Sequence, residues 1–418
     1  MNVFRPHHDA SLPPALIIDG GANVLSVARS LGRRGVRVLV LGSARTDTRF
    51  SRFCEWIPLS GKGSIHTQWL SWFLGEEGKA FRGGVIIPCG DNGLECIVHH
   101  RAELEQHFRV YEANDEVLAA MLDKAATHSL AKKAGVPSPE IWIVNTRKEV
   151  LEVKDTIRFP CGLKPRVSHE FKKHFDKKLF VVHDADELLR VFGMVEPFNL
   201  EMMITELIPG GDNGYCSYYS YLDEEGKPLF HFTKRKLRQH PTGFGIGTYH
   251  LTDWNKDVAD LGLKFFQGIG LRGLACVEFK VDPRDGQLKL IECNHRFTEA
   301  NELVMLSGLD LASLVYNRLV GLPLPKLDSY KRGMCLIKPW QDVLAFRQLH
   351  SRGELTWRTW IAQLARPMSF LYFKWWDPMP TLYQWYLFIR KQIRRMSGSV
   401  KKQSNPQTVS EASVMKAS

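Results

Sequence analysis

The sequence has no CxxC pair, no regular cysteine spacing, and no apolar leader with a cleavage site after Met1. Together these absences favour reduced thiols in a cytoplasmic protein, most of them buried as small apolar side chains. The eight cysteines are residues 54, 89, 96, 161, 216, 276, 293 and 335.

Most of the chain also lacks net charge of either sign. Residues 1–330 hold 41 basic and 41 acidic side chains, so the whole excess of 11 lies in residues 331–418, with 15 basic and 4 acidic side chains. Because residues 1–330 carry no net positive charge to attract phosphate groups, we expect no nucleic-acid partner. With 44% hydrophobic and 24% charged residues, the chain otherwise has the composition of an ordinary folded protein of two or three domains.

The N-terminal region lacks the fingerprint of a dinucleotide-binding site. Two apolar segments, 15–19 and 36–41, have the pattern of buried strands and flank a helix expected over 24–34. The turn has two glycines, Gly20 and Gly21, but not the spacing that cradles a pyrophosphate, and no acidic residue closes the second strand. We expect a Rossmann-like unit that does not bind NAD.

A third apolar strand is expected over 84–88, followed by Asp91 and Glu95. Ligands of open α/β sheets bind outside the carboxyl ends of strands, so these two carboxylates are candidates for contact with the acceptor substrate. An alternative for Asp91 is a helix N-cap. A helix over 115–134 and a strand over 141–144 should follow.

Two carboxylates are the most informative feature of the chain. Segments 275–282 and 290–296 alternate as half-buried strands do, and the Asp-Pro-Arg-Asp-Gly run between them predicts a hairpin turn. The hairpin would bring Glu278 and Glu292 together, with Asn294 further along the same face. Such oxygen ligands suit Mg²⁺ that also holds nucleotide phosphates.

Arg296 lies on the same face as Asn294 and would offer a bidentate fork to a phosphoryl group. The alternative for the whole hairpin is a surface element with scattered charges. Helices expected over 262–271 and 309–321 would flank it.

Four segments in a fixed order carry a family resemblance. They are LDK at 122–124 with LAKKAGVPSP at 130–139, FPCGLKP at 159–165, ITELIPGG at 204–211, and the Glu278–Glu292 hairpin. Spread over about residues 120–320, they resemble the ATP-grasp superfamily of carboxylate-activating ligases. KRKLRQHP at 234–241 followed by GFGIG at 243–247 resembles the carboxylate–amine ligases, including D-aspartate ligase-like enzymes.

The resemblance implies a role for each matching residue. Lys124 and Lys164 would contact the nucleotide phosphates, and the segment of Glu206, Leu207, Ile208 and Asp212 would hold the nucleotide. Glu278, Glu292 and Asn294 would hold one or two Mg²⁺ ions, with Mn²⁺ as an alternative metal. Arg296, with Lys236 or Lys234, would stabilise the transferring phosphoryl group. Three histidines, His240, His250 and His295, are candidates for a general base or for structural roles.

One segment departs from the family pattern. Many ATP-grasp proteins have a glycine-rich flap after the lysine strand, but residues 165–192 contain no glycine. This segment has Arg166 and four lysines instead, which would either cover the phosphates or form a solvated loop. The lysines are residues 172, 173, 177 and 178.

The basic C-terminal region interleaves aromatic and cationic residues. Within 382–396, apolar residues recur at helical spacing, with Arg390, Lys391, Arg394 and Arg395 on the other side. We expect this helix either to pack on the body or to lie on an anionic membrane surface, with RNA or a partner protein as further alternatives. A membrane-spanning helix is not expected, because charged residues and prolines interrupt the apolar runs.

The fold class expected is α/β: a Rossmann-like N-terminal domain, an ATP-grasp fold of two α+β subdomains, and a C-terminal helical extension. The expected boundaries are 1–115, 116–198 for the lid, 199–330 for the metal and substrate subdomain, 331–396 for the basic extension and 397–418 for a disordered tail.

The function implied by the resemblance is ATP-dependent ligation of a carboxylate to an amine through an acyl phosphate. The partners expected are ATP and small-molecule or lipid-linked substrates. The alternatives are a thiol or carbamate acceptor, or a membrane-associated nucleotide-binding protein without turnover.

Overall fold

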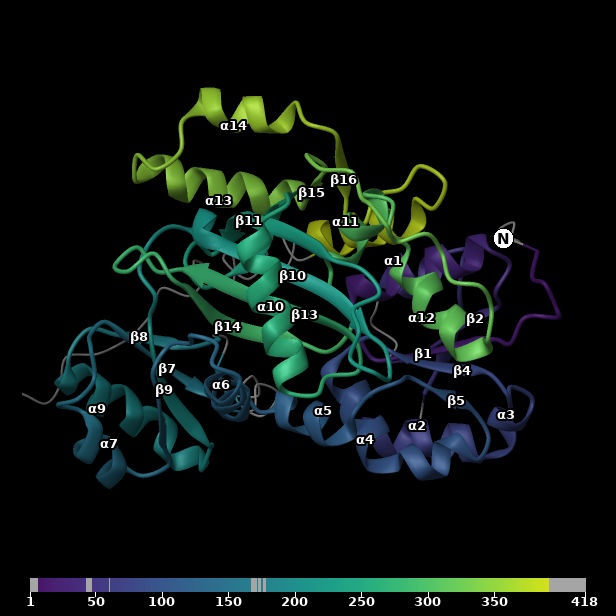
Figure 1. Cartoon of the computed structure of the whole chain (residues 1–418), viewed down its shortest axis with the longest axis horizontal. Helices are drawn as coiled ribbons and strands as arrows, with labels where there is room; N and C mark the ends of the chain where they lie inside the picture. The colour runs from purple at the N-terminus through teal and green to yellow at the C-terminus, as the bar shows by residue number, and fades with distance from the viewer. Residues whose placement is uncertain are drawn as a thin grey trace, which may run out of the picture.

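Three β-sheets with packed helices make up the protein (Figure 1). The structure is a computed structural model that describes residues 7–42, 47–59, 61–166, 171, 174–175 and 178–390. In Figure 1 the N-terminal sheet lies at the lower right and a small sheet at the lower left, with the largest sheet above them.

The N-terminal sheet is parallel and has five strands in the order β3-β2-β1-β4-β5. Its strands β1 and β4 are completely buried, as continuous apolar runs in parallel sheets are. Gly20 has φ of +99°, and a Cβ there would meet the Cys89 carbonyl oxygen at 2.7 Å, so the turn after β1 requires glycine. The Rossmann-like unit that the sequence predicts is confirmed. Its elements are β1 (Ala15–Ile18), α1 (Ala22–Arg33), β2 (Val38–Gly42), η1 (Asp47–Phe50), β3 (Glu55–Pro58), α2 (Ile65–Leu74), α3 (Glu76–Lys79), β4 (Val85–Pro88), α4 (Asp91–Glu105) and β5 (Arg109–Val110).

The helix predicted over 115–134 is two helices, α5 (Asp115–Leu122) and α6 (Lys124–Lys133). Asp123 separates them, because its backbone is extended and its carboxylate accepts the Ala125 N–H at 2.8 Å. An aspartate that caps the next helix in this way competes with continuing the first one.

The small sheet is antiparallel, with four strands in the order β6-β9-β7-β8. Helices α7 and α9 pack on it around a core that includes Leu163, Phe192 and Ile204. Its elements are β6 (Ile141–Val144), α7 (Arg147–Val153), β7 (Cys161–Pro165), β8 (Phe180–Val182), α9 (Ala185–Val195), η2 (Glu196–Phe198) and β9 (Met202–Glu206).

The largest sheet has seven strands in the order β14-β13-β10-β11-β12-β15-β16. One face is covered by α10, whose Gly262 lies so close to Tyr218 that a Cβ would overlap the ring. Helix α10 begins at Lys256, earlier than the helix predicted over 262–271. The helix predicted over 309–321 matches α12. The elements up to residue 320 are η3 (Asp212–Gly214), β10 (Tyr215–Leu222), β11 (Phe232–His240), β12 (Ile246–Thr252), α10 (Lys256–Gly268), β13 (Gly273–Val281), β14 (Leu288–Asn294), α11 (Asn301–Leu306) and α12 (Leu311–Val320).

The region expected to be an extension contributes to this sheet. It supplies the strands β15 (Cys335–Ile337) and β16 (Met368–Phe370), with α13 (Pro339–Ser351) and α14 (Trp357–Leu364) between them. In Figure 1 these two helices lie above β11. A further helix is described over 379–390. Lys391, Arg394, Arg395 and the tail predicted over 397–418 lie outside the described residues.

A buried ion pair fastens α13 to the sheet. Arg238 of β11 donates to both carboxylate oxygens of Asp342 at 2.7 and 3.0 Å, and both side chains are buried. The same carboxylate accepts the Trp360 indole N–H at 2.9 Å and the Thr248 hydroxyl at 3.0 Å. Four donors thus converge on one anion, which satisfies its buried charge.

All eight cysteines are free thiols, and all but the partly exposed Cys293 are buried, as the sequence predicts. Within the described residues, no helix is both long enough and apolar enough to cross a membrane.

Removing the Asp342 carboxylate should destabilise the protein strongly. Asp342→Ala leaves the buried Arg238 guanidinium without its counter-ion, a change that costs about 3–5 kcal/mol. We expect a fall of that size in the free energy of unfolding, measured by urea denaturation. The exposed Asp155, replaced by alanine, is the control and should have little effect. A loss under about 1 kcal/mol for Asp342→Ala would contradict the coupling of α13 to β11.

Candidate nucleotide and metal site

The two predicted carboxylates lie directly opposite each other. Strands β13 and β14 form the predicted antiparallel hairpin, and their register pairs Glu278 with Glu292. Directly opposed side chains share one face of a sheet, with Cβ atoms about 5 Å apart. Asn294, two residues further along β14, places its Nδ2 3.5 Å from Glu292 Oε1. The three predicted metal ligands are therefore brought together.

Two predicted catalytic lysines lie on the same face, on strand β11. Lys236 Nζ donates to Glu278 Oε1 at 2.7 Å, and both side chains are largely buried. Lys234 Nζ donates to Ser217 Oγ at 3.1 Å and lies 3.4 Å from His250 Nδ1. The register explains this grouping, because β10 lies between β11 and β13 and pairs Ser217 with both Lys234 and Glu278.

The crowding of cations changes the protonation of this face. Burial lowers the pKa of Lys234. Burial also lowers the pKa of His250 well below its ordinary value, and the charges of Lys234, Lys236 and Lys338 lower it further. His250 is therefore neutral near pH 7 and can accept a hydrogen bond from the Lys234 ammonium.

The predicted phosphate-binding lysines come from two elements, Lys164 from β7 of the small sheet and Lys124 from the start of α6. Burial, together with the charge of Lys124 and against the opposing charge of Glu292, lowers the pKa of Lys164 on β7 to about 8. Lys164 therefore lies within electrostatic range of both Lys124 and Glu292. Lys124 Nζ also donates to the Pro165 carbonyl at 3.3 Å, which ties α6 to the end of β7.

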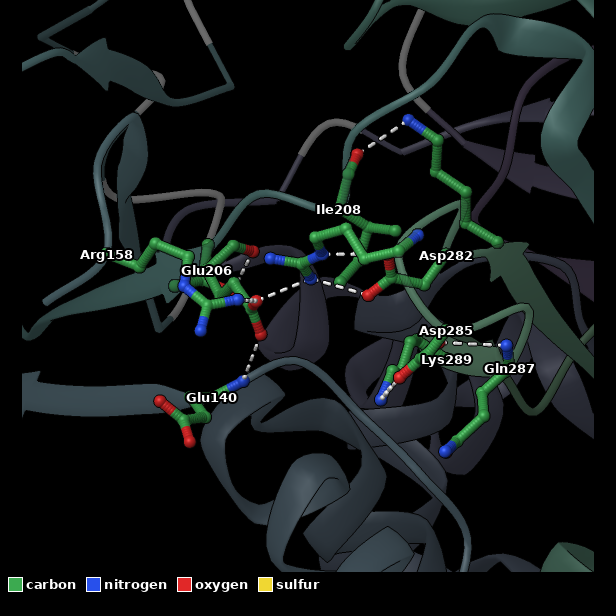
Figure 2. Close-up of polar contacts among 11 residues, drawn as sticks. Glu140, Arg158, Glu206, Ile208, Asp282, Asp285, Gln287 and Lys289 are labelled. Atoms are coloured by element: carbon green, nitrogen blue, oxygen red, sulfur yellow. Dashed lines mark hydrogen bonds and ion pairs between the residues drawn. The ribbon is translucent and has the colours of Figure 1, made fainter.

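Glu206, the last residue of β9, is the first residue of the segment predicted to hold the nucleotide (Figure 2). Glu206 Oε1 accepts from Arg284 at 2.6 Å, and Oε2 accepts the Glu140 N–H at 3.2 Å. In Figure 2 the Glu206 side chain lies between Arg158 and Asp282. These contacts hold the start of the segment against the β13–β14 turn.

Further along, the carbonyl oxygen of Ile208, after Leu207, accepts from Lys280 Nζ at 2.8 Å (Figure 2). Asp212 is buried, and its Oδ1 accepts from Gln239 at 2.8 Å and from the Gly243 N–H at 2.9 Å. Its Oδ2 is also buried and has no hydrogen-bond partner among the described residues. A buried carboxylate oxygen of this kind is suited to accept from a ligand hydroxyl group.

Arg296 connects the hairpin to the N-terminal sheet. Its Nε donates to Asp91 Oδ1 at 2.6 Å, just after the carboxyl end of β4. The N-cap of α4 is Gly90, so Asp91 is the first helical residue and not the cap. Glu95, the other acidic candidate, lies 3.8 Å from His66 Nε2.

Of Arg166 and the four lysines noted in the glycine-free segment, two residues are described. Arg166 forms an ion pair with Asp123, and Lys178 Nζ donates to the Gly245 carbonyl at 3.1 Å. Lys172, Lys173 and Lys177 lie outside the described residues. The hydrogen bond of Lys178 links the small sheet to the loop between β11 and β12.

Lys338 was not among the residues that the sequence singled out. It precedes α13, is largely buried, forms an ion pair with Glu299, and is one of the charges that lower the pKa of His250. Its backbone N–H donates to the Thr248 carbonyl at 2.9 Å. No motif surrounds it, and only the pairing of β12 with β15, which no local pattern predicts, could have located it.

The donor set fits a cation that also binds phosphate. Over the ranges that the structure describes, no three His, Cys, Asp or Glu side chains gather into a metal-binding group. Two carboxylates and an amide are too few to fill the six positions around Mg²⁺, which commonly completes its shell with phosphate oxygens and water.

Solved structures share this fold. The biotin carboxylase domain of 2-oxoglutarate carboxylase from Hydrogenobacter thermophilus, in complex with MgADP and bicarbonate, matches with a TM-score of 0.61 at 15% identity over 77% of this chain and 73% of that one. An L-amino acid ligase from Bacillus licheniformis matches with a TM-score of 0.57 at 15% identity over 73% and 74%. The fold is that of the ATP-grasp enzymes, and the predicted fold class is confirmed.

Sequence comparison finds a curated relative whose name is that of a ligase of the predicted kind. The chain is 29% identical over 241 residues to D-aspartate ligase of Enterococcus faecium, an alignment that covers 55% of this chain and 57% of that protein. The chain thus spans little more than half of that relative's length. No protein-family model matches the chain. The resemblance to ATP-grasp carboxylate–amine ligases is confirmed.

Nucleotide affinity should depend on the charge of Lys164. With a pKa of about 8, this ammonium is charged at neutral pH and loses its proton as the pH rises through that value. The affinity for ATP, measured by calorimetry, should then fall above pH 8, by up to about tenfold per pH unit if only the charged form binds. Lys164→Arg, which stays charged, should bind ATP with little pH dependence. Identical pH profiles for the two proteins would contradict this role for Lys164.

Proposed function

We propose that this protein is an ATP-dependent ligase that joins a carboxylate to an amine through an acyl phosphate and releases ADP and phosphate. The observation that carries the proposal is the register that sets Glu278 opposite Glu292, beside the buried Lys236 and Lys234. Phosphoryl transfer requires carboxylates that hold a metal and ammonium groups that bind phosphoryl oxygens. Both kinds of group lie on this one face of the sheet.

Glu278, Glu292 and Asn294 would hold one or two Mg²⁺ ions, with Mn²⁺ as the alternative. Bound there, the metal neutralises charge on the phosphates of ATP. Lys164 on β7 and Lys124 at the start of α6 would contact the same phosphates. The backbone of Leu207 and Ile208, after Glu206, would hold the adenine edge. Asp212 supports this assignment, because its unpartnered Oδ2 can accept from a ribose hydroxyl.

In the first step, an oxygen of the substrate carboxylate attacks the γ-phosphorus of ATP, the bond to the β,γ-bridging oxygen breaks, and ADP leaves. Lys234, Lys236 and Arg296 donate to the phosphoryl oxygens, where negative charge is spread in the transition state. Lys338, beside His250, is a candidate to hold the substrate carboxylate, because it is a partly desolvated cation on the same face.

In the second step, the amine nitrogen attacks the acyl carbon, the acyl C–O bond breaks, and inorganic phosphate leaves with the bridging oxygen and takes up the proton that the nitrogen loses. The ion pair of Arg296 with Asp91 lies where the N-terminal sheet meets the hairpin. This position supports entry of the amine from the carboxyl end of β4, where open α/β sheets bind ligands.

The substrates proposed are a small-molecule or lipid-linked carboxylate and amine. The relative named D-aspartate ligase makes an amino acid the first donor to test. We place the reaction in the cytoplasm, which the eight free thiols support. Buried thiols without disulfides are typical of a reducing compartment.

ADP release is the direct test. We expect ATP turnover to require both a carboxylate and an amine, screened from pools of amino acids and amines, with one amide formed per ADP. Hydroxylamine in place of the amine should trap the activated carboxylate as a hydroxamate, because an acyl phosphate reacts with any good nucleophile. Hydrolysis of ATP that is independent of substrate and gives no hydroxamate would contradict the proposal.

A further inference from the structure

The helix over 379–390 turns its apolar stripe outward. Leu382, Trp385, Tyr386 and Ile389 recur at spacings of three and four residues and so share one face. Their exposed fractions are 48%, 63%, 55% and 56%. In a soluble protein such a stripe normally faces the core.

Aromatic residues that flank the stripe contact the body. The ring of Tyr383 lies 4.3 Å from that of Phe50, and the ring of Phe388 lies 5.2 Å from that of Trp340. Just before the helix, Asp377 forms a buried ion pair with Arg29 of α1 at 2.9 Å. Packing on the body, one of the outcomes expected for this helix, therefore uses residues that flank the apolar stripe and leaves the stripe itself exposed.

Further apolar side chains are exposed close to the stripe in sequence or in contact with the helix. Trp375, 81% exposed, and Phe373 come from the loop before the helix, and Met379 is its first residue. Trp340, which contacts Phe388, is also more than half exposed. A soluble monomer rarely exposes so many large apolar groups together, and such patches mark interaction surfaces.

Arginines from the N-terminal domain border this surface. Arg49 stacks on Phe50 at 4.9 Å, and Phe50 contacts Tyr383 of the helix. Arg33 stacks on Trp376 at 5.1 Å, next to the exposed Trp375. Arg390, at the end of the helix, is exposed. Only the fold shows these arginines together, because Arg33 and Arg49 are more than 300 residues from the helix in sequence.

We propose that this surface, formed by Trp340, Trp375, Leu382, Trp385, Tyr386 and Ile389 and bordered by Arg33, Arg49 and Arg390, seats the protein on an anionic phospholipid bilayer. Tryptophan and tyrosine prefer the headgroup level, where their rings are buried and their polar atoms stay hydrated. A helix that lies in the interface needs one apolar face and flanking cations, as found here.

The charge pattern favours a bilayer over a second copy of the chain. Arg33, Arg49 and Arg390 all border the surface, so two such surfaces would bring like charges together. An anionic bilayer complements both parts of the surface. The apolar stripe enters the boundary between headgroups and acyl chains, and the arginines contact the headgroup phosphates.

Vesicle co-sedimentation of the full chain tests the proposal. We expect binding to phosphatidylglycerol vesicles and little binding to phosphatidylcholine vesicles. The double variant Trp385→Ser/Ile389→Ser should lower the partition coefficient about tenfold or more, even at high salt, because its loss is apolar. The control is Ile143→Ser/Leu151→Ser, which removes two apolar side chains that are 48% and 45% exposed on the small sheet and α7, and it should bind like wild type.

A second double variant tests the arginines that border the surface. Arg49→Gln/Arg390→Gln should weaken binding about tenfold or more at low salt and much less at high salt, where the headgroup field is screened. The exposed Arg190→Gln is its control. ATP turnover away from vesicles should be the same in all these variants, so a failed membrane proposal is distinguishable from a failed ligase proposal.

Three outcomes would overturn the proposal. The first is no binding of wild type to phosphatidylglycerol, and the second is unchanged binding of Trp385→Ser/Ile389→Ser. The third is a concentration-dependent dimer, seen by analytical ultracentrifugation, that this variant abolishes while wild type ignores vesicles. That result would make the surface an interface between copies of the chain.

Discussion

The ion pair between Lys236 and Glu278 is the constraint on which the site depends. An ammonium and a carboxylate are both costly to bury, and their contact at 2.7 Å offsets that cost only while both are in place. Lys234 and Lys280 are buried on the same face, so its buried cations outnumber Glu278. An anionic ligand would relieve this imbalance, and the partly exposed end of the hairpin, with Glu292, is where a phosphate and its metal would reach it.

The parts of the fold that are set by local patterns were predictable. The apolar runs of β1 and β4 could only be buried strands, and a Pro-Arg-Asp-Gly turn between two alternating segments fixed both the hairpin and the opposition of Glu278 and Glu292. The division between α5 and α6 was missed, because the capping carboxylate of Asp123 outweighs the helical pattern on either side of it.

Contacts between distant segments could not be predicted. Nothing near Arg296 indicates that it pairs with Asp91, 205 residues earlier. The pairing of β12 with β15 likewise depends on the closing of a long loop, and it is what brings Lys338 to His250. Such a contact depends on the whole fold, and local propensity does not specify it.

The C-terminal region has an inner and an outer part. The inner part, β15, β16 and α13, completes the sheet that carries the site and is fastened to it by Asp342. The outer part, the helix over 379–390, contributes little to the core and exposes most of its large apolar side chains. Both parts belong to one continuous segment. A membrane surface that binds the outer helix would therefore also orient the sheet that carries the site.

Binding of Mn²⁺ tests the central claim, that Glu278 and Glu292 form a metal site together with a nucleotide. Electron paramagnetic resonance titration in the presence of ADP should show one or two bound Mn²⁺ ions per chain. Glu292→Gln should weaken this binding about tenfold or more, because it removes a charged ligand, whereas the exposed Glu152→Gln should leave it unchanged. If Glu292→Gln bound Mn²⁺ as tightly as wild type, the metal would lie elsewhere and the account of the site would be wrong.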